Sequence, residues 1–372
     1  MNPKFFMVVI GLLLVVVIAV KMTKSGPEPI PETSSALDDR PKEPDPAAIA
    51  QPSRPRLPAP ALPPLTNSTD TIQSPSQVTI RKMLTGEAFP ELSADHIEKY
   101  LKENQRSAES LILAAGLTKD VNLLREAATN FPGDPRVHLT LAFDGEGPEE
   151  KSRALAAFRA ADPDNSLGDY LAAYEDLKAG RTDAAVTNLM LATSKSRMED
   201  YSRDQIQPIA EAHLSAGRSV AVAKVAGHNG MDLSHLSPLR DLGKQLVSLQ
   251  DEYAQGGDAE SAQAVGEIGR HLSGQLQTQG GITVVSELVG MLVEKNFLDT
   301  MDPATVIDAN GLTATQRLAD LEQRKQYLKE LALAQTLALE LSERDAVVYM
   351  DRTRLFGEVA AWEWLREKFG TP

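Results

Sequence analysis

The sequence predicts an all-α fold, and three observations support this prediction. From about residue 93 to residue 372, apolar side chains recur at a spacing near 3.6 residues, whereas the alternation typical of strands is almost absent. In the same part, a short phrase recurs in which a glycine is followed two residues later by a serine or threonine. Proline, which interrupts helices, is concentrated earlier, because residues 25–85 hold 13 of the 23 prolines.

The first expected element is one membrane-spanning helix. Residues Phe5–Val20 form an unbroken apolar run, FFMVVIGLLLVVVIAV, with lysines on both sides. The run is about 24 Å long as a helix, and flanking lysines can extend it towards the roughly 30 Å of a hydrocarbon core. We expect residues 1–24 to act as a membrane anchor spanning about residues 5–22, with a cleaved signal peptide as the less favoured alternative. An early apolar segment favours export, so the bulk of the chain is expected on the periplasmic or extracellular side.

Residues 25–85 are expected to form a disordered, proline-rich linker. Stretches such as Pro27-Glu28-Pro29-Ile30-Pro31 favour extended polyproline II geometry and cannot build a core. The first 24 residues carry three lysines, and the linker has one more acid than bases. Because the whole chain has a net charge of −14, residues 86–372 must carry about −16. This acidity disfavours nucleic-acid binding and suits solubility or a basic partner.

The helices that follow begin at capping residues. Ser93, Ser107 and Thr118 each precede a run with helical apolar spacing, and their side chains can accept a hydrogen bond from the first free N–H groups. Glycine can take the left-handed conformation that ends a helix. The phrases Gly116-Leu117-Thr118, Gly180-Arg181-Thr182 and Gly217-Arg218-Ser219, with a looser Gly257-Asp258, therefore predict one helix ending and the next beginning.

These signals repeat at offsets between 30 and 40 residues, which indicates helical hairpins with loops of variable length. Asp134-Pro135-Arg136-Val137 aligns with Asp164-Asn165-Ser166-Leu167 at an offset of 30. The phrase at Gly180 aligns with that at Gly217 at an offset of 37, and Gly257 follows 40 residues later. Residues 220–225, VAVAKV, alternate like a strand, but their register with the helix expected after Thr182 favours a helix.

Within these hairpins, a turn at residues 162–165, two tyrosines at 170 and 174, Gly180 and the small residue Ala185 follow one another. This order resembles the tetratricopeptide repeat. The best copy covers residues 162–195 and weaker, degenerate copies cover about 107–275. The resemblance implies that residues 86–280 form an α-solenoid with a protein-binding role.

Residues 281–372 are expected to form a C-terminal helical bundle that caps the solenoid. One helix is predicted from Thr283 to Met301, and Thr313-Ala314-Thr315-Gln316 has the form of a capping box opening a helix through Leu341. A weaker signal at Ser342 opens the last one. Trp362 and Trp364 lie about 200° apart on a helix, so one of them is expected to be less buried than the other.

No pattern typical of catalysis occurs in the sequence. Serine-elbow, Walker, dinucleotide and His-Glu-x-x-His motifs are absent, and the chain has no cysteine. Glu267 and His271 lie one helical turn apart and could share a metal, but a solvated ion pair is the simpler interpretation. His228 and His235 flank a loop and are expected to cap turns. We therefore predict no catalytic residue, cofactor or metal.

The sequence favours a membrane-tethered, non-catalytic scaffold that binds a peptide or protein partner in a groove lined by Tyr170 and Tyr174. The alternative is an enzyme of cell-envelope processing or assembly whose site lies in the C-terminal bundle. A pocket that gathers several titratable side chains there would favour the enzyme. The sequence identifies neither the partner nor the oligomeric state.

Overall fold

The computed structural model describes residues 74–278, 283–308 and 310–370. Over these residues the predicted all-α class is confirmed, with sixteen α-helices, one 3₁₀ helix and no strand. The predicted membrane anchor and the linker up to residue 73 lie outside the described residues. None of the described helices is long and apolar enough to cross a bilayer.

The helices follow one another with short connections. In chain order they are α2 (Pro75–Leu84), α3 (Ala94–Glu103), α4 (Ala108–Thr118), α5 (Val121–Asn130), α6 (Pro135–Asp144), α7 (Gly147–Ala161), α8 (Leu167–Lys178), α9 (Thr182–Thr193), α10 (Ser202–Ser215), α11 (Val220–Asn229), α12 (Leu236–Gln255), α13 (Ala259–Thr278), α14 (Val284–Leu298), α15 (Ala314–Ala332), the 3₁₀ helix η1 (Leu333–Glu340), α16 (Glu343–Phe356) and α17 (Glu358–Phe369).

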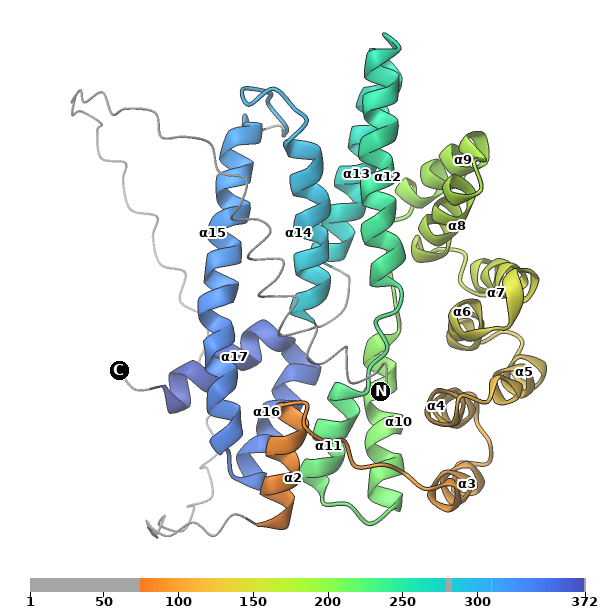
Figure 1. The fold of residues 1–372 in the computed structure, drawn as a ribbon, viewed down its shortest axis with the longest axis vertical. Helices are drawn as coiled ribbons and strands as arrows, with labels where there is room; N and C mark the ends of the chain where they lie inside the picture. Colours follow the sequence, from red (N-terminus) through yellow and green to blue (C-terminus); the bar gives the residue numbers. More distant parts are fainter. Residues whose placement is uncertain (1–73, 279–282, 309, 371–372) are drawn as a thin grey trace, which may run out of the picture.

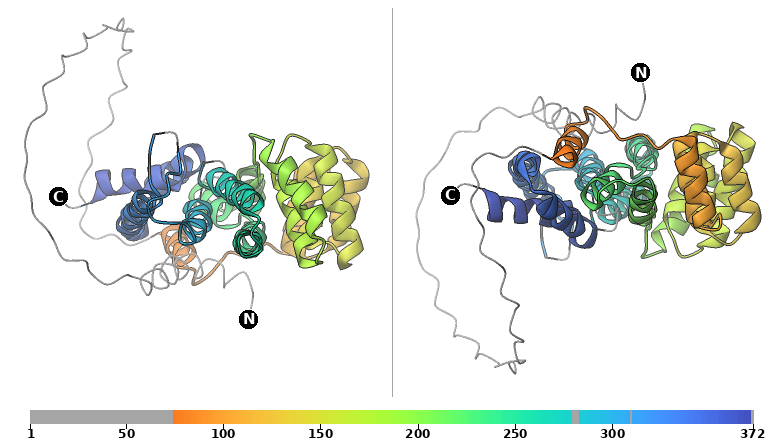
Figure 2. Two further views of the ribbon diagram at one scale, coloured as in Figure 1. Left: turned by 90° about the horizontal axis from the view of Figure 1, so that it is seen from above. Right: turned by 90° about the horizontal axis from the view of Figure 1, so that it is seen from below.

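Consecutive helices pack in pairs: α4 with α5, α6 with α7, α8 with α9, α10 with α11 and α12 with α13. Helices α3–α9 form an arc at one side of the molecule, and α10–α17 together with α2 form a block beside it (Figures 1 and 2). The arc contacts the block at both ends, because α10 packs against α3 and α4 while α12 packs against α8.

Most of the predicted caps are confirmed. The side chains of Ser93, Ser107, Ser219, Thr283, Thr313 and Ser342 each accept a hydrogen bond from a backbone N–H of the following helix. Residues 220–225 belong to α11, so the helical interpretation of that alternating stretch is confirmed.

The repeated glycine phrase performs the predicted role in only some copies. Gly180, Gly217 and Gly257 take positive φ values of 71°, 77° and 80°, as predicted. At Gly116 the prediction is wrong, because α4 continues to Thr118, Lys119 takes the left-handed conformation and Asp120 caps α5. Thr182 lies inside α9 and makes no cap.

The predicted linker is too long at its C-terminal end, because residues 75–84 form helix α2. Ser74 caps this helix in a capping box and Pro75 occupies the first turn, where its missing N–H is tolerated. Ile80 and Met83 are buried, and α2 packs against α11 and η1. The apolar stripe of this short helix thus completes a core formed by residues far along the chain.

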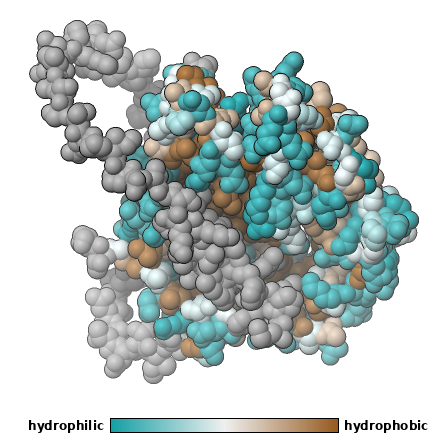
Figure 3. All heavy atoms as spheres, turned by 45° about the horizontal axis from the view of Figure 1, so that its top comes forward, coloured by the Kyte–Doolittle hydropathy of each residue, from teal (hydrophilic) through white to brown (hydrophobic). Residues whose placement is uncertain are grey.

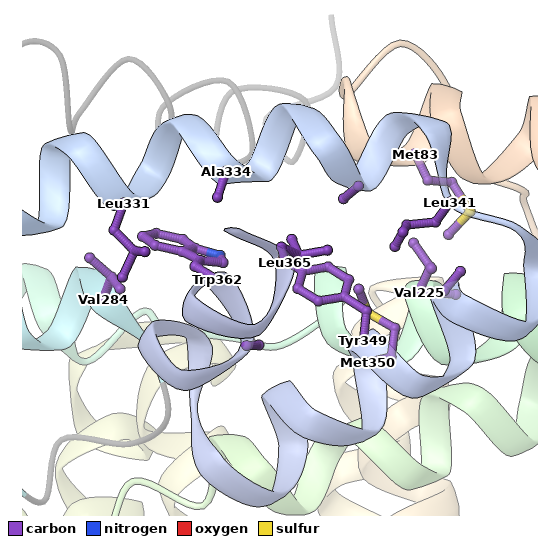
Figure 4. Packing of buried hydrophobic residues seen from close by; sticks show 14 of the residues in the cluster. Met83, Val225, Val284, Leu331, Ala334, Leu341, Tyr349, Met350, Trp362 and Leu365 are labelled. Atoms are coloured by element: carbon purple, nitrogen blue, oxygen red, sulfur yellow. The ribbon is translucent and has the colours of Figure 1, made fainter. Parts of the chain in front are cut away.

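The buried core shows no division at residues 280/281, where the sequence predicted a domain boundary. One cluster joins Met83 of α2 and Val225 of α11 to the C-terminal helices, with Trp362 and Leu365 of α17 at its centre (Figure 4). A second cluster joins α8, α12 and α13 to Phe297 of α14. Helices on either side of the expected boundary therefore share their cores.

The C-terminal helices largely follow the prediction. The helix opened by Thr313 ends at Ala332 and continues to Glu340 as the tighter η1 rather than as an α-helix through Leu341. Trp362 is buried, at 3% exposure, whereas Trp364 is partly exposed, which confirms that the two tryptophans differ in burial.

Candidate binding surface

The groove predicted at Tyr170 and Tyr174 is not available to a partner. Tyr170 is fully buried, and its hydroxyl lies 2.8 Å from Nδ1 of His271 on α13. Tyr174 is half-buried, with the ammonium of Lys178 5.1 Å from its ring centre. Tyr170 cannot line an open groove, because α12 packs against α8 and His271 of α13 contacts the Tyr170 hydroxyl, so the chain itself covers this residue.

The pair Glu267 and His271 is also used differently from either interpretation of the sequence. His271 contacts Tyr170, and Glu267 accepts a hydrogen bond of 3.0 Å from Gln263 on the same helix. Across residues 74–278, 283–308 and 310–370, no group of three or more potential ligands is arranged to hold a metal ion.

A buried polar network fixes α8 to its neighbours, and sequence patterns did not reveal it. Asp169, at 1% exposure, pairs with Arg159 of α7 and with Lys195 of the loop before α10. Ser166 donates a hydrogen bond of 2.8 Å to the side chain of Gln275 on α13, and Gln275 donates one of 3.0 Å to the Lys195 carbonyl. Because these groups satisfy one another, the network is structural and offers nothing to a ligand.

Half-exposed carboxylates gather where α4, α6 and α10 meet. Arg136 on α6 is their shared cation: its guanidinium bonds Asp134 at 2.7 Å and Glu109 of α4 at 2.7 Å, and it lies 3.9 Å from Asp204 of α10. Glu211 lies two turns further along α10. We call the set of Glu109, Asp134, Arg136, Asp204 and Glu211 the acidic junction.

The titration behaviour of nearby groups shows that this region is negative. Burial, followed by the charges of Glu211 and Glu109, raises the pKa of the Tyr100 hydroxyl. Burial and the nearby charges of Asp200 and Asp204 raise the pKa of Glu199, against a hydrogen bond from the Tyr201 N–H. Burial opposes ionisation of Asp134 too, but the Arg136 guanidinium prevails and holds the pKa of Asp134 below its usual range.

Two carboxylates of the acidic junction keep room for another cation. Asp204 is 52% exposed and meets Arg136 only at 3.9 Å, beyond hydrogen-bond distance. Glu109, which is 50% exposed, bonds Arg136 through Oε1 at 2.7 Å. These side chains come from three segments, namely α4, the start of α6 and α10, that meet only after folding, which explains why sequence spacing missed them. The excess of acids over bases was the available signal.

The described surface offers charge more than apolar area. In Figure 3, hydrophilic residues cover most of the visible described surface, and hydrophobic residues appear in small groups. Large exposed hydrophobic side chains include Met190 and Leu191 on α9 and Leu355 and Phe356 on α16. Recognition at the acidic junction would therefore rest on electrostatic complementarity.

The C-terminal bundle, where the alternative placed an enzyme site, pairs several of its carboxylates with single cations. Glu294 meets Arg317 at 2.6 Å, and Glu287 meets Arg324 at 2.6 Å. These pairs bridge neighbouring helices, since they join α14 to α15. Such geometry is typical of ion pairs that stabilise helix packing, and it does not favour a proton-transfer site.

One buried histidine and carboxylate pair lies nearer the middle of the chain. His235 Nε2 and Asp200 Oδ2 are 3.0 Å apart at 4% and 3% side-chain exposure, although their orientation is not that of a hydrogen bond. Ser202 donates to Asp200 at 2.8 Å instead of to the imidazole. A nucleophilic serine needs the histidine beside it, so this trio lacks the arrangement of a hydrolase triad.

The two histidines that were expected to cap turns do not do so. His228 Nε2 lies 3.3 Å from Glu358, His235 lies beside Asp200, and neither histidine makes a side-chain cap.

No protein-family model, curated protein or solved structure matches this chain. The resemblance to tetratricopeptide repeats therefore stays a prediction that depends on the residues alone.

Proposed function

We propose that this chain is a non-catalytic, membrane-tethered α-solenoid scaffold that binds a basic, extended segment of a partner protein at the acidic junction. The observation that carries the proposal is that Glu109 and Asp204 share the single guanidinium of Arg136, with Glu211 two turns further along α10. The pairing of helices in the arc supports a solenoid, and the apolar run Phe5–Val20 supports a tether.

The spacing of the carboxylates suggests the form of the ligand. Asp204 and Glu211 are seven residues apart on one helix, which corresponds to about 10 Å along its axis. A peptide in polyproline II conformation places every third residue on one side, about 9 Å apart. A segment with lysine or arginine at every third position therefore matches these two carboxylates better than a run of adjacent cations.

The proposal is tested by binding of two labelled peptides to the full chain in detergent. Both have the same lysine, proline and alanine content, but one carries lysine at every third position and the other has its lysines clustered. We expect the first to bind more tightly, and Asp204→Asn to weaken it about tenfold, which corresponds to about 1.4 kcal/mol. Raising the salt concentration should weaken binding further.

The matched control is Glu252→Gln, which removes one negative charge at the exposed end of α12. Equal affinity of the Asp204→Asn variant, the Glu252→Gln variant and the unaltered chain for the spaced peptide would contradict the assignment of the acidic junction. Equal affinity of both peptides would contradict the proposed form of the ligand.

A further inference from the structure

Aromatic and cationic side chains alternate along one side of α16 and α17. The Lys368 ammonium lies 4.8 Å from the Phe369 ring centre and 4.9 Å from that of Trp364. The Arg352 guanidinium lies 5.6 Å from the Trp364 ring and 5.6 Å from the Phe356 ring. We call Phe369, Lys368, Trp364, Arg352 and Phe356 the aromatic–cation row.

This row has unused binding capacity. Phe356 is 64% exposed, and its neighbour Leu355 is 65% exposed. Nε of Arg352 is buried and has no hydrogen-bond partner within the described part of the chain. Trp364 packs edge-on against Phe369 at 5.5 Å between ring centres, so both rings are held in place while remaining partly exposed. Preformed, partly open rings with cations beside them constitute a docking surface.

The chemistry of the row selects a proline-rich, acidic ligand. Proline-rich segments in polyproline II conformation dock on aromatic side chains because their shape is already set before binding. Arg352 and Lys368 add positive charge on either side of Trp364. Because Lys368 is shared with Asp345, carboxylates in the same segment are favoured chiefly by Arg352. A proline-rich segment that carries arginine would be repelled.

The chain itself contains such a segment outside the described residues. Residues 27–32, Pro-Glu-Pro-Ile-Pro-Glu, hold three prolines and two acids and no base. Two other proline stretches fit the row less well, because residues 41–46 carry Lys42 beside their two acids and residues 52–64 carry Arg54 and Arg56. Charge complementarity therefore distinguishes the three stretches and selects residues 27–32.

The point where the described chain begins brings this segment within reach. Ser74 Oγ donates a hydrogen bond of 2.7 Å to Glu343, the first residue of α16, and Asp345 in the same turn bonds Lys368 at 2.6 Å. The chain therefore enters the fold beside one end of the row, which follows α16 for about 20 Å at most. The 42 residues from Glu32 to Ser74 are enough to reach the whole row, since a flexible chain of this length spans roughly 35 Å and an extended polyproline II chain about 130 Å.

We propose that residues 27–32 dock in cis on the aromatic–cation row. Prolines lie against Trp364 and Phe356, and the carboxylates of Glu28 and Glu32 face Arg352 and Lys368. Linkage gives the segment an effective concentration in the millimolar range, so a weak contact is sufficient for occupancy. Docking joins the first residues after the apolar run to the last helices of the fold and so shortens the tether.

The absence of cysteine makes a distance measurement direct. Spin labels on introduced cysteines at Ser34→Cys and Glu367→Cys, in the full chain in detergent, report the separation of the segment and α17 by pulsed electron resonance. We expect a narrow distribution at short distance. A broad distribution that extends to long distances, as expected for an undocked chain, would overturn the proposal.

Two further variants separate docking from damage to the fold. Glu28→Gln with Glu32→Gln changes only the segment, and Arg352→Gln changes only the row; each should broaden the distribution. Arg344→Gln, on the exposed first turn of α16, is the matched control and should leave it narrow. No effect of the segment variant would contradict the charge pairing. A short distance that appears only between singly labelled molecules mixed together would replace the cis contact with one between two copies.

Discussion

His213 lies buried in α10, at 3% exposure, and its Nδ1 atom has no hydrogen-bond partner within the described part of the chain. Burial, aided by the charge of Arg218, lowers the pKa of His213 from 6.5 to about 4. The unfolded chain therefore binds a proton between pH 6.5 and pH 4 while the folded chain does not. In this window the free energy of unfolding falls as the pH falls.

The first prediction concerns that pH dependence. Lowering the pH from 7 to 5 should cost the folded chain about 2 kcal/mol through His213 alone. Replacement by His213→Leu removes this proton, so the loss of stability over the same pH range should be smaller by about that amount. Urea unfolding of both chains at pH 7 and pH 5 measures the difference. Parallel losses in the two chains would show that His213 does not ionise on unfolding as described.

Individual residues were predictable from the sequence when their role is local. Ser219 and Ser342 cap helices because a hydroxyl directly before a helix can reach its free N–H groups, whatever the rest of the molecule does. Asp169 was not predictable, because its partners Arg159 and Lys195 come from other segments. The acidic junction was missed for the same reason.

Helices α13 and α14 approach so closely that one position has no room for a side chain. A Cβ atom on Gly269 would lie 2.1 Å from the ring of Phe297, whereas one on Gly274, in the same helix, would meet nothing within 4 Å. Small residues at such a contact allow α14 to seat its large phenylalanine in the shared core.

The second prediction compares these two glycines. Gly269→Ala should lower the free energy of unfolding by about 1–3 kcal/mol, because the ring of Phe297 must move. Gly274→Ala should be neutral or stabilising by up to about 1 kcal/mol, since alanine favours the helix. Thermal and chemical unfolding of both variants provide the measurement. A similar effect at both positions would contradict the close contact.

The third prediction concerns the glycine phrases. Gly217 has a φ of 77°, so Gly217→Ala should destabilise the turn between α10 and α11 by about 1 kcal/mol. Gly116 lies within α4, with open space around its Cβ position, so Gly116→Ala should stabilise the chain slightly. Chemical unfolding curves measure both changes. Equal losses of stability in the Gly217→Ala and Gly116→Ala variants would contradict the different roles of the two glycines.

Element boundaries were predictable where the breaker and the cap lie side by side. At Gly217 and Ser219 the two signals act together, and α10 ends where α11 is about to begin. At Gly116 the helix continues for two more residues, because glycine permits a left-handed conformation without requiring it and Lys119 adopts that conformation instead. Sequence alone does not reveal which of the two positions is used.

At the scale of the whole molecule, the first described helix, α2, shares a core with the last helices. Ile80 and Met83 of α2 belong to the same core as Tyr349 and Trp362, which come from the last two helices. Covering that core requires α2.

The fourth prediction follows from this packing. A chain that begins at residue 74 should unfold at nearly the same denaturant concentration as the full chain, because it keeps α2 and the weak contact of residues 27–32 adds little. A chain that begins at residue 86 should lose about 3–6 kcal/mol, because two buried side chains are removed. Met83→Ala in the full chain should cost about 2–5 kcal/mol and serves as a milder version of the same change. Full stability of the shorter chain would contradict the role of α2.

The helical class and most helix starts of this molecule were predictable, but the way in which distant helices pack against one another was not. Apolar periodicity predicts which residues of α8 and α12 are buried, and it does not predict that the two helices bury each other. The assignment of Tyr170 to an open groove was wrong because a buried aromatic and a groove aromatic have the same spacing. Contacts between distant segments depend on the three-dimensional path of the chain.

The attachment of α2 has a mechanical consequence. Any pull on the chain from before Ser74 reaches the fold through α2, which packs against α11 and η1 and whose Met83 carbonyl accepts a hydrogen bond from Asn229. Tension would therefore act as shear between α2 and the helices beside it, whereas helices α3–α9 lie outside the path of the force. Such an arrangement would let the packing among α3–α9 keep its shape while α2 is under tension.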